Sequence, residues 1–195
     1  MRGAAQRLII AITGASGARY GIDLLRHLKT RPDIETHLVV SPSGWLTISS
    51  ETGLGKADVE QLADINHPPK AIGDSIASGS FRTAGMVIAP CSMHTLAAVA
   101  LGLSDNLIAR AADVTLKERR KLILLTRETP LNLAHLRNMV SVTEMGGIIM
   151  PPVPAFYNNP ASLDDLFADS TRRILELLTL AGDADRREWN GLQPG

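Results

Sequence analysis

Residues 8–29 read LIIAI-TGASG-ARYGIDLLRHLK, and this stretch decides the fold class. The apolar run Leu8–Ile12 is typical of a buried β-strand, and Ala18–Lys29 places its apolar residues on one helical face. The glycine-containing segment Thr13–Gly17 connects the two. Because a strand, a tight turn and a helix form the first half of a βαβ crossover, the sequence predicts a parallel sheet with helices packed against it.

The same alternation continues along the chain. Further strands are predicted at 36–40, 86–89, 122–126 and 148–150, and further helices at 44–52, 56–63, 95–101, 106–119, 131–142 and 162–180. Residues 66–83 are rich in Pro, Gly and Ser and predict an irregular segment with at most a short strand near Ala71. We therefore expect a doubly wound α/β fold with helices on both faces of the sheet. We expect one domain over residues 1–195, ending in a polar tail at 181–195.

The composition of the 195-residue chain limits its function class. Hydrophobic residues make up 45% and charged residues 21%, which is enough apolar material for a core. The formal net charge is zero, which argues against a dedicated nucleic-acid binder. Cys91 is the only cysteine, which excludes an intrachain disulfide and a multi-cysteine metal site. The run Leu8–Ile12 is too short for a secretory signal, and no run approaches the roughly 18 apolar residues of a membrane span, so we expect a cytoplasmic protein.

Binding sites in such folds lie beyond the carboxyl ends of the strands, and four predicted loops lie there. The first is Thr13–Gly17. Its glycines allow a tight turn, and the N-terminus of the next helix offers unpaired N–H groups to a phosphate. Ser16 either caps that helix in an ordinary turn or binds such a phosphate. The glycine spacing matches neither GxGxxG nor GxxxxGK, so the NAD and ATP fingerprints are both absent.

The second loop, Pro90–Ala98, follows a predicted strand that Pro90 is expected to end. Ser92 is placed to cap the next helix, whose N-terminus is another anion site. We expect Cys91 to be a small buried hydrophobic residue rather than a nucleophile. His94 is either catalytic or an incidental exposed histidine.

The third loop, Arg127–Pro130, places a carboxylate beside an arginine at a strand end. Glu128 is therefore either the ion-pair partner of Arg127 or an acid/base group with a tuned pKa. The basic run at 117–121 is either a solvated patch or part of a phosphate pocket.

The fourth loop, Pro151–Tyr157, contains three prolines that restrict its backbone. It either holds Tyr157 against a ligand or braces a neighbouring subunit. Arg173, in the last predicted helix, either adds a positive charge to the same site or faces solvent.

Taken together, these loops resemble the UbiX-type flavin prenyltransferases, formerly described as aromatic-acid decarboxylases. The resemblance covers residues 7–178 and rests on six segments in the same order. They are TGASGARYG at 13–21, SSET at 49–52, PCSMHTLA at 90–97, RAADVTLKERR at 110–120, RETPLNLAHLRNM at 127–139 and PPVPAFY at 151–157. Any one segment is weak evidence for the family, but six segments in this order are specific for it.

The resemblance implies a flavodoxin-like fold and a homo-oligomer, typically a dodecamer, with the active site at a junction between subunits. Members of the family join a dimethylallyl group from dimethylallyl monophosphate to N5 and C6 of reduced FMN, and they use no metal. The prenylated FMN then serves a separate decarboxylase of the UbiD type. The expected flavin is therefore FMN, and no nucleic-acid or membrane partner is expected.

The resemblance also carries functional residues over to this chain, position by position. The expected flavin-binding residues are Gly14, Ala15, Ser16, Ser41, Ser92, Met93, His94, Thr95 and Arg127. The expected substrate-binding residues are Lys117, Tyr157 and Arg173, and catalytic roles are implied for Ser16, Glu51, Lys117 and Glu128. A leaving phosphate needs cations and hydrogen-bond donors, which Lys117, Tyr157 and Arg173 supply. Glu128 or the departing phosphate can take the proton lost when the second bond forms.

Two features depart from the family pattern: Pro42, with Trp45 nearby, and Trp189 in the tail, whose spacing does not align safely. Two other functions stay open. One is a cysteine decarboxylase of the same broad fold. Such an enzyme needs a catalytic histidine on the first helix and a Met-Asn substrate loop. This chain has only His27 on that helix and has no Met-Asn loop. The other is a non-catalytic flavin carrier or assembly subunit, which does not need the residues around the prenyl phosphate.

Overall fold

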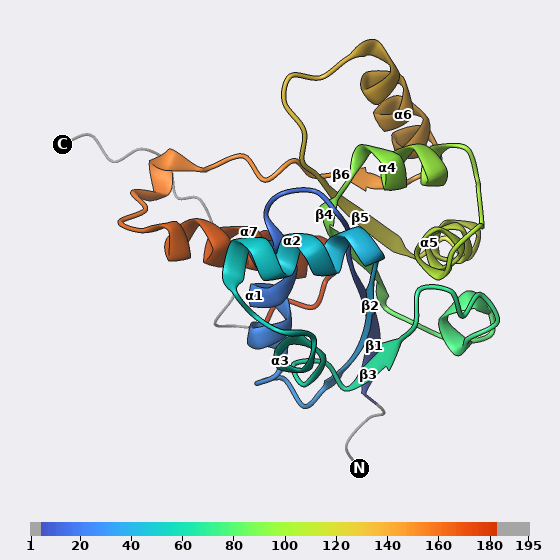
Figure 1. The fold of residues 1–195 in the computed structure, drawn as a ribbon, viewed down its shortest axis with the longest axis horizontal. Helices are drawn as coiled ribbons and strands as arrows, with labels where there is room; N and C mark the ends of the chain where they lie inside the picture. Colours follow the sequence, from blue (N-terminus) through green and yellow to red (C-terminus); the bar gives the residue numbers. More distant parts are fainter. Residues whose placement is uncertain (1–4, 183–195) are drawn as a thin grey trace.

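The computed structural model describes residues 5–182, which build a six-stranded sheet (Figure 1). The strands are β1 (Gln6–Ile12), β2 (Ile34–Val40), β3 (Ile65–His67), β4 (Gly85–Cys91), β5 (Lys121–Thr126) and β6 (Ile148–Ile149). Their spatial order is β3-β2-β1-β4-β5-β6, and every pairing is parallel. The predicted doubly wound parallel sheet is confirmed.

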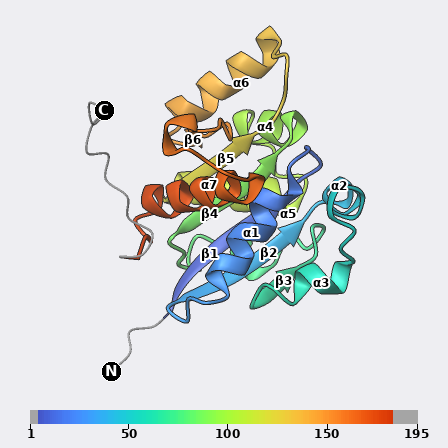
Figure 2. The same cartoon turned by 90° about the vertical axis from the view of Figure 1, so that its left-hand side faces the viewer.

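Helices cover both faces of this sheet. They are α1 (Ala18–Leu28), α2 (Pro42–Thr52), α3 (Lys56–Glu60), α4 (Met93–Ala100), α5 (Leu107–Lys117), α6 (Leu133–Glu144) and α7 (Leu163–Leu177), with short 3₁₀ turns η1 (Ser75–Ala77) and η2 (Phe156–Asn158). Figures 1 and 2 show α1 and α7 on one side of the sheet and α4 and α5 on the other. No helix within residues 5–182 is long and apolar enough to cross a membrane.

Strand β1 shows why its apolar run is continuous. Leu8, Ile10 and Ile12 pack in the core beneath α1 and α7, whereas Ile9 and Ala11 pack in the core beneath α4 and α5. Successive side chains of a strand point to opposite faces, so a strand covered on both sides needs apolar residues at every position. Burying each large aliphatic side chain contributes roughly 1.5–3 kcal/mol, which makes β1 a central support of the fold.

The direction of winding reverses between β1 and β4. Strand β1 pairs with β2 on one side and with β4 on the other. The helices that follow β1 and β4 leave toward opposite faces, and in open parallel sheets such a reversal is where a ligand-binding crevice lies, beyond the carboxyl ends of the two strands. Helix α1 packs closely against β4: a Cβ atom added at Gly21 would lie only 2.3 Å from the Ala89 carbonyl oxygen. A side chain at that position would push α1 and its preceding glycine loop away from β4.

Three element boundaries differ from those predicted. The short strand expected near Ala71 lies earlier, because Ile65–His67 pairs with β2 as the edge strand β3. Strand β4 continues through Pro90 to Cys91 with an irregular register against β5, so the proline does not end it. Helix α6 begins only after Asn132, whose side chain accepts a hydrogen bond from the backbone of the first turn. Residues 183–195, with Trp189 and most of the predicted tail, lie outside the described residues.

Candidate active site

A buried threonine ties the two sides of the crevice together. The Thr13 hydroxyl donates to the Pro90 carbonyl oxygen at 2.8 Å and accepts from the Ser92 backbone N–H at 2.8 Å. The Thr13 side chain therefore links the end of β1 to the turn between β4 and α4. Sequence reasoning did not single out this residue, because the contact joins positions 77 and 79 residues apart.

The predicted loop after β4 forms a capped helix start. Ser92 is the N-cap of α4: its hydroxyl accepts from the Thr95 N–H at 3.3 Å and donates to the Thr95 hydroxyl at 3.1 Å. Met93 is half-buried and His94 is exposed. Cys91 is fully buried, and burial raises the pKa of its thiol, as expected of a packing residue rather than a nucleophile. The capping role of Ser92 is confirmed.

A second capped start lies after β2. Ser41 is the N-cap of α2 and accepts from the Gly44 N–H at 2.9 Å. The loop after β1 approaches this turn closely, since a Cβ atom at Gly14 would lie 2.5 Å from the Ser43 hydroxyl oxygen. The absence of a side chain at Gly14 therefore lets the first and second loops pack together at the crevice.

The N-terminus of α1 is capped by a residue from α2. Gly17, at φ 101°, takes the N-cap position of α1 without a side-chain bond. Ser16 therefore does not cap this helix, which was one of the two alternatives for it. The Glu51 carboxylate instead accepts from the Gly17 N–H at 2.9 and 3.0 Å and from the Ala18 N–H at 2.9 Å. A carboxylate of the chain itself thus occupies the anion position at the start of α1.

The electrostatics of this cap hold Glu51 ionised. Partial burial alone would raise the pKa of Glu51, but hydrogen bonds from Ser16, Ala18 and Gly17 and the charge of Arg127 bring it below its usual 4.5. Ser16 therefore lies beside Glu51. The capping role of Glu51 was not predicted from the sequence, because Glu51 and Gly17 are 34 residues apart.

Arg127 and Glu128 follow directly after the end of β5. The Arg127 backbone N–H donates to the Cys91 carbonyl oxygen at 3.3 Å, so the two strand ends are joined. Burial raises the pKa of Tyr20 and the charge of Arg127 partly opposes this, so the guanidinium also lies near α1. The exposed Glu128 carboxylate accepts from the Thr129 N–H at 3.1 Å. Sequence analysis left two roles open for Glu128, ion-pair partner of Arg127 or acid/base group. Within residues 5–182, the structure shows no ion pair between Glu128 and Arg127.

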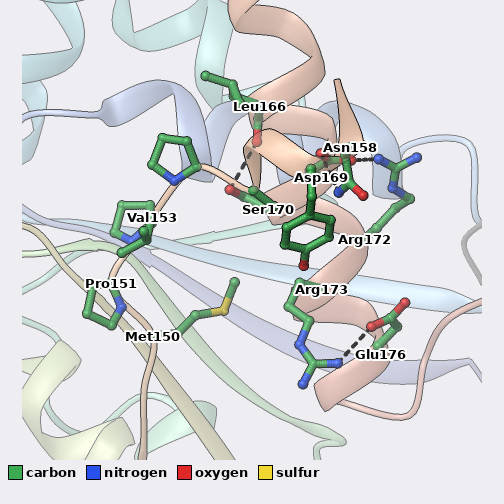
Figure 3. Close-up of a pocket in the computed structure, with 14 residues that line it drawn as sticks. Met150, Pro151, Val153, Asn158, Leu166, Asp169, Ser170, Arg172, Arg173 and Glu176 are labelled. Carbon is green, nitrogen blue, oxygen red and sulfur yellow. Dashed lines mark hydrogen bonds and ion pairs between the residues drawn. The ribbon is translucent and has the colours of Figure 1, made fainter. Parts of the chain in front are cut away.

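Tyr157 and Arg173 line one cavity of about 530 Å³ (Figure 3). Its walls are the proline-rich loop after β6 and one side of α7. Arg173 is exposed and pairs with Glu176 at 2.9 Å, and Tyr157 is also exposed. The other side of α7 contacts α1, where Phe167 packs edge-on against Tyr20. The structure thus brings together the two predicted substrate-binding residues of the last loop and helix.

Lys117 lies far from the other predicted site residues in the same chain. It ends α5 at the amino-terminal side of the sheet, where it pairs with Glu118. Strand β5 then runs six residues to Thr126, which at about 3.3 Å per residue separates its two ends by about 20 Å. Lys117 and Arg127 of one chain therefore cannot meet at one ligand.

The crevice fits a flavin mononucleotide. Hydroxyl groups of Ser41, Ser92 and Thr95 and the cation of Arg127 lie around the carboxyl ends of the central strands, which suits a single phosphate and a polar ring edge. Gly14 keeps one wall free of a side chain. Within the described part of the chain, no group of three or more His, Cys, Asp or Glu residues is placed to hold a metal ion.

Comparison with known proteins agrees with this geometry. Residues 2–171 match the Flavoprotein family model. The chain is 54% identical over 187 residues to the flavin prenyltransferase UbiX of Neisseria meningitidis serogroup B, covering 96% of this chain and 98% of that protein. It is 51% identical over 188 residues to UbiX of Escherichia coli K12, covering 95% and 99%. The chain belongs to the flavin prenyltransferase family. The resemblance drawn from six short segments is confirmed.

Solved structures of UbiX and UbiX-like proteins superpose closely on this chain. One is a UbiX protein in complex with FMN and dimethylallyl pyrophosphate, with a TM-score of 0.92 and 47% identity, covering 97% of this chain and all of that one. Another is a dodecameric FMN-dependent UbiX-like decarboxylase from Escherichia coli O157:H7, with a TM-score of 0.91 and 47% identity, covering 95% of this chain and all of that one. The cysteine decarboxylase TvaF, at 15% identity and a TM-score of 0.63, shares only the fold.

Proposed function

We propose that this chain is a flavin prenyltransferase that joins a dimethylallyl group from dimethylallyl monophosphate to N5 and C6 of reduced FMN. The observation that carries the proposal is the crevice at the β1–β4 reversal, lined by capped helix starts and Arg127, in a chain of this family. FMN supplies the two acceptor atoms when it is bound. The protein residues hold the flavin, stabilise the leaving phosphate and move a proton.

The flavin-binding residues of the proposal come from four loops at the carboxyl edge of the sheet. They are Gly14, Ala15, Ser16, Ser41, Ser92, Met93, His94, Thr95 and Arg127. Met93 and His94 contribute through their backbone, because helix starts present N–H groups to a phosphate whatever the side chain. Glu51 holds the glycine loop in place through the N-terminus of α1 and lies beside Ser16, which supports a role for both near the reacting groups.

The leaving phosphate is the second requirement. When the carbon–oxygen bond of the donor breaks, its electron pair stays on the phosphate, which needs cations and hydrogen-bond donors. Tyr157 and Arg173 already share a cavity, and Arg173 can turn from Glu176 to the phosphate. Lys117 can join them only from another copy of the chain, because the length of β5 separates it from the site in its own chain.

Glu128 is the proposed proton acceptor. Forming the second carbon bond releases a proton, and a carboxylate that is exposed and not paired with Arg127 is available to take it. The departing phosphate is the other group that can accept this proton. In either case the electron pair of the broken carbon–oxygen bond leaves on the phosphate, and the proton lost from the flavin is taken up by Glu128 or by that phosphate.

The assembly and the onward partner complete the proposal. A dodecameric relative and the position of Lys117 support a homo-oligomer, for which a dodecamer is our choice. The product is proposed to serve a UbiD-type decarboxylase in the cytoplasm, and the chain is proposed to act as one domain.

Anaerobic mixing of the protein with reduced FMN and the prenyl donor tests the proposal. A prenyltransferase increases the mass of the flavin by one isoprenyl unit, whereas a flavin carrier or a cysteine decarboxylase leaves the flavin mass unchanged. Parallel reactions with the monophosphate and the pyrophosphate establish which donor is used. An unchanged flavin with both donors, in protein that binds FMN, would favour the carrier or the decarboxylase.

A further inference from the structure

Asp169 is an acidic residue in the cavity that the proposed function assigns to the prenyl phosphate. It lies on α7 one helical turn before Arg173, and both side chains line the cavity of about 530 Å³ together with Tyr157. A carboxylate beside a phosphate opposes its binding, because both groups are negatively charged. An acidic residue in this position therefore calls for a compensating charge and for partners within the protein.

Both carboxylate oxygens of Asp169 have such partners. Oδ1 forms an ion pair with Arg172, three residues further along α7, and Oδ2 accepts a hydrogen bond from the Asn158 side-chain amide at 3.1 Å. Figure 3 shows Asn158 and Arg172 beside Asp169, with Arg173 further along the same helix. The side chains of Asp169 and Arg172 are 15% and 23% exposed, whereas that of Arg173 is 61% exposed. Arg172 therefore balances the charge of Asp169, and Arg173 is the cation more open to a ligand.

The hydrogen bond from Asn158 joins α7 to the turn that carries Tyr157. Asn158 directly follows Tyr157 in the 3₁₀ turn η2. Phe156 and Tyr157 are both exposed, and within residues 5–182 the backbone of η2 makes few close contacts with α7. Little buried apolar surface therefore holds this turn in place, so the side-chain bond to Asp169 sets its distance from the helix.

We propose that Asp169 is a positioning residue for the prenyl donor. Through Asn158 it holds Tyr157 over the side of α7 that carries Arg173, so that the Tyr157 hydroxyl and the Arg173 guanidinium contact the same phosphate. The inference rests on the proposed function, which assigns Tyr157 and Arg173 to that phosphate. Asp169 acts through the Asn158 amide and not on the substrate itself.

Binding of the prenyl donor tests this role without turnover. The proposed reaction needs reduced FMN, so calorimetry on protein loaded with oxidised FMN measures the Kd of dimethylallyl monophosphate directly. Asn158→Ala removes the amide without adding a charge, and it should raise this Kd at least about tenfold, as expected when a hydrogen bond to a charged group is lost. Asp164→Ala is the matched control and should leave the Kd at the wild-type value. Asp164 also lies on α7 and pairs with an arginine, Arg19 at 2.9 Å, but it does not line the cavity.

The same measurement in a Tyr157→Phe background separates positioning from a general loss of structure. A residue that acts only by placing the Tyr157 hydroxyl has no further effect once that hydroxyl is absent. Adding Asn158→Ala should therefore change the Kd by less than about twofold in this background. Exchanging the two groups gives a rescue. Asn158→Asp alone should weaken donor binding, and combining it with Asp169→Asn should restore binding, because a carboxylate–amide hydrogen bond then forms in the opposite sense. The affinity for FMN should be unchanged in all of these variants.

Two results would overturn the proposal: a wild-type Kd for Asn158→Ala, or an equal loss of donor affinity in the wild-type and Tyr157→Phe backgrounds. Its failure is distinguishable from failure of the proposed function. If the wild type prenylates reduced FMN and Asn158→Ala binds the donor normally, only the positioning role is wrong. If the expected pattern of Kd values is found but reduced FMN stays unchanged, the phosphate site and its positioning residue stand and the transfer reaction is wrong.

Discussion

Replacing Glu51 by alanine should destabilise the protein through the start of α1. The carboxylate accepts hydrogen bonds from the Gly17 and Ala18 N–H groups at 2.9–3.0 Å, and no side chain at the N-cap position replaces it. Removing it leaves two donors at the positive end of the helix without this acceptor. The same change loosens the glycine loop that forms one wall of the crevice.

The magnitude follows from the cap geometry. Losing a capping acceptor costs about 1 kcal/mol, and the charge at a helix N-terminus adds about 0.3–1 kcal/mol, reduced here because Glu51 is solvent-exposed. We expect Glu51→Ala to lower the free energy of unfolding by about 1–2 kcal/mol. Glu51→Gln loses the charge and one of the two oxygens that face the Gly17 N–H, but it keeps an acceptor oxygen for the Gly17 and Ala18 N–H groups, so it should cost only about 0.3–1 kcal/mol.

Urea unfolding at neutral pH measures both variants, with Ser50→Ala as the matched control on the same helix. The pKa of Glu51 is lowered in the folded chain, so its charge stabilises the fold above the unfolded pKa of about 4.5, and this contribution is lost as the pH falls through the folded pKa. The difference between wild type and Glu51→Gln should therefore shrink in acid. A Glu51→Ala variant as stable as Ser50→Ala would refute the capping role.

Three further predictions concern the chemistry, the assembly and the pH dependence of stability. Glu128→Gln should slow product formation by roughly 10²–10⁴-fold while changing the free energy of FMN binding by less than about 1 kcal/mol; a wild-type rate would refute the proton-acceptor role. Lys117→Ala and Glu128→Gln should each be nearly inactive. When the two variants are co-assembled in equal amounts, about a quarter of the wild-type rate should return, because about a quarter of the sites built from two copies then have both residues intact. No recovery would place Lys117 outside a shared site. Burial lowers the pKa of His37, more than the hydrogen bond to Glu35 raises it. The unfolded chain therefore binds more protons below about pH 6.5, so urea unfolding from pH 7.5 to 5.5 should show stability falling in wild type and falling less in His37→Gln; equal slopes would refute this.

Most of the fold was predictable because its strands are buried on both faces. A strand such as Leu8–Ile12 must be apolar at every position, and this leaves a clear run in the sequence. Strand β3 was misplaced because it is a three-residue edge strand with two exposed positions, and only its pairing with β2 identifies it. Such an edge strand carries no hydrophobic pattern of its own.

The site was predictable where its contacts are local. Ser92 caps the helix that follows it within three residues, so the sequence sufficed. The cap of α1 by Glu51 and the link between Thr13 and Ser92 join distant segments, and only the fold shows them. Lys117 lies at the amino-terminal ends of the strands, opposite to the site at their carboxyl ends. This position follows from chain order, because a helix that precedes a parallel strand ends at that strand's amino-terminal side.

The central claim is tested most directly by measuring flavin mass and released phosphate in one anaerobic reaction of the protein with reduced FMN and dimethylallyl monophosphate. The account predicts that the flavin gains one isoprenyl unit and that one phosphate is released for each flavin converted. Both changes should be absent when FMN is omitted. A flavin of unchanged mass in protein shown to bind FMN, or phosphate release without any gain in flavin mass, would contradict the assignment.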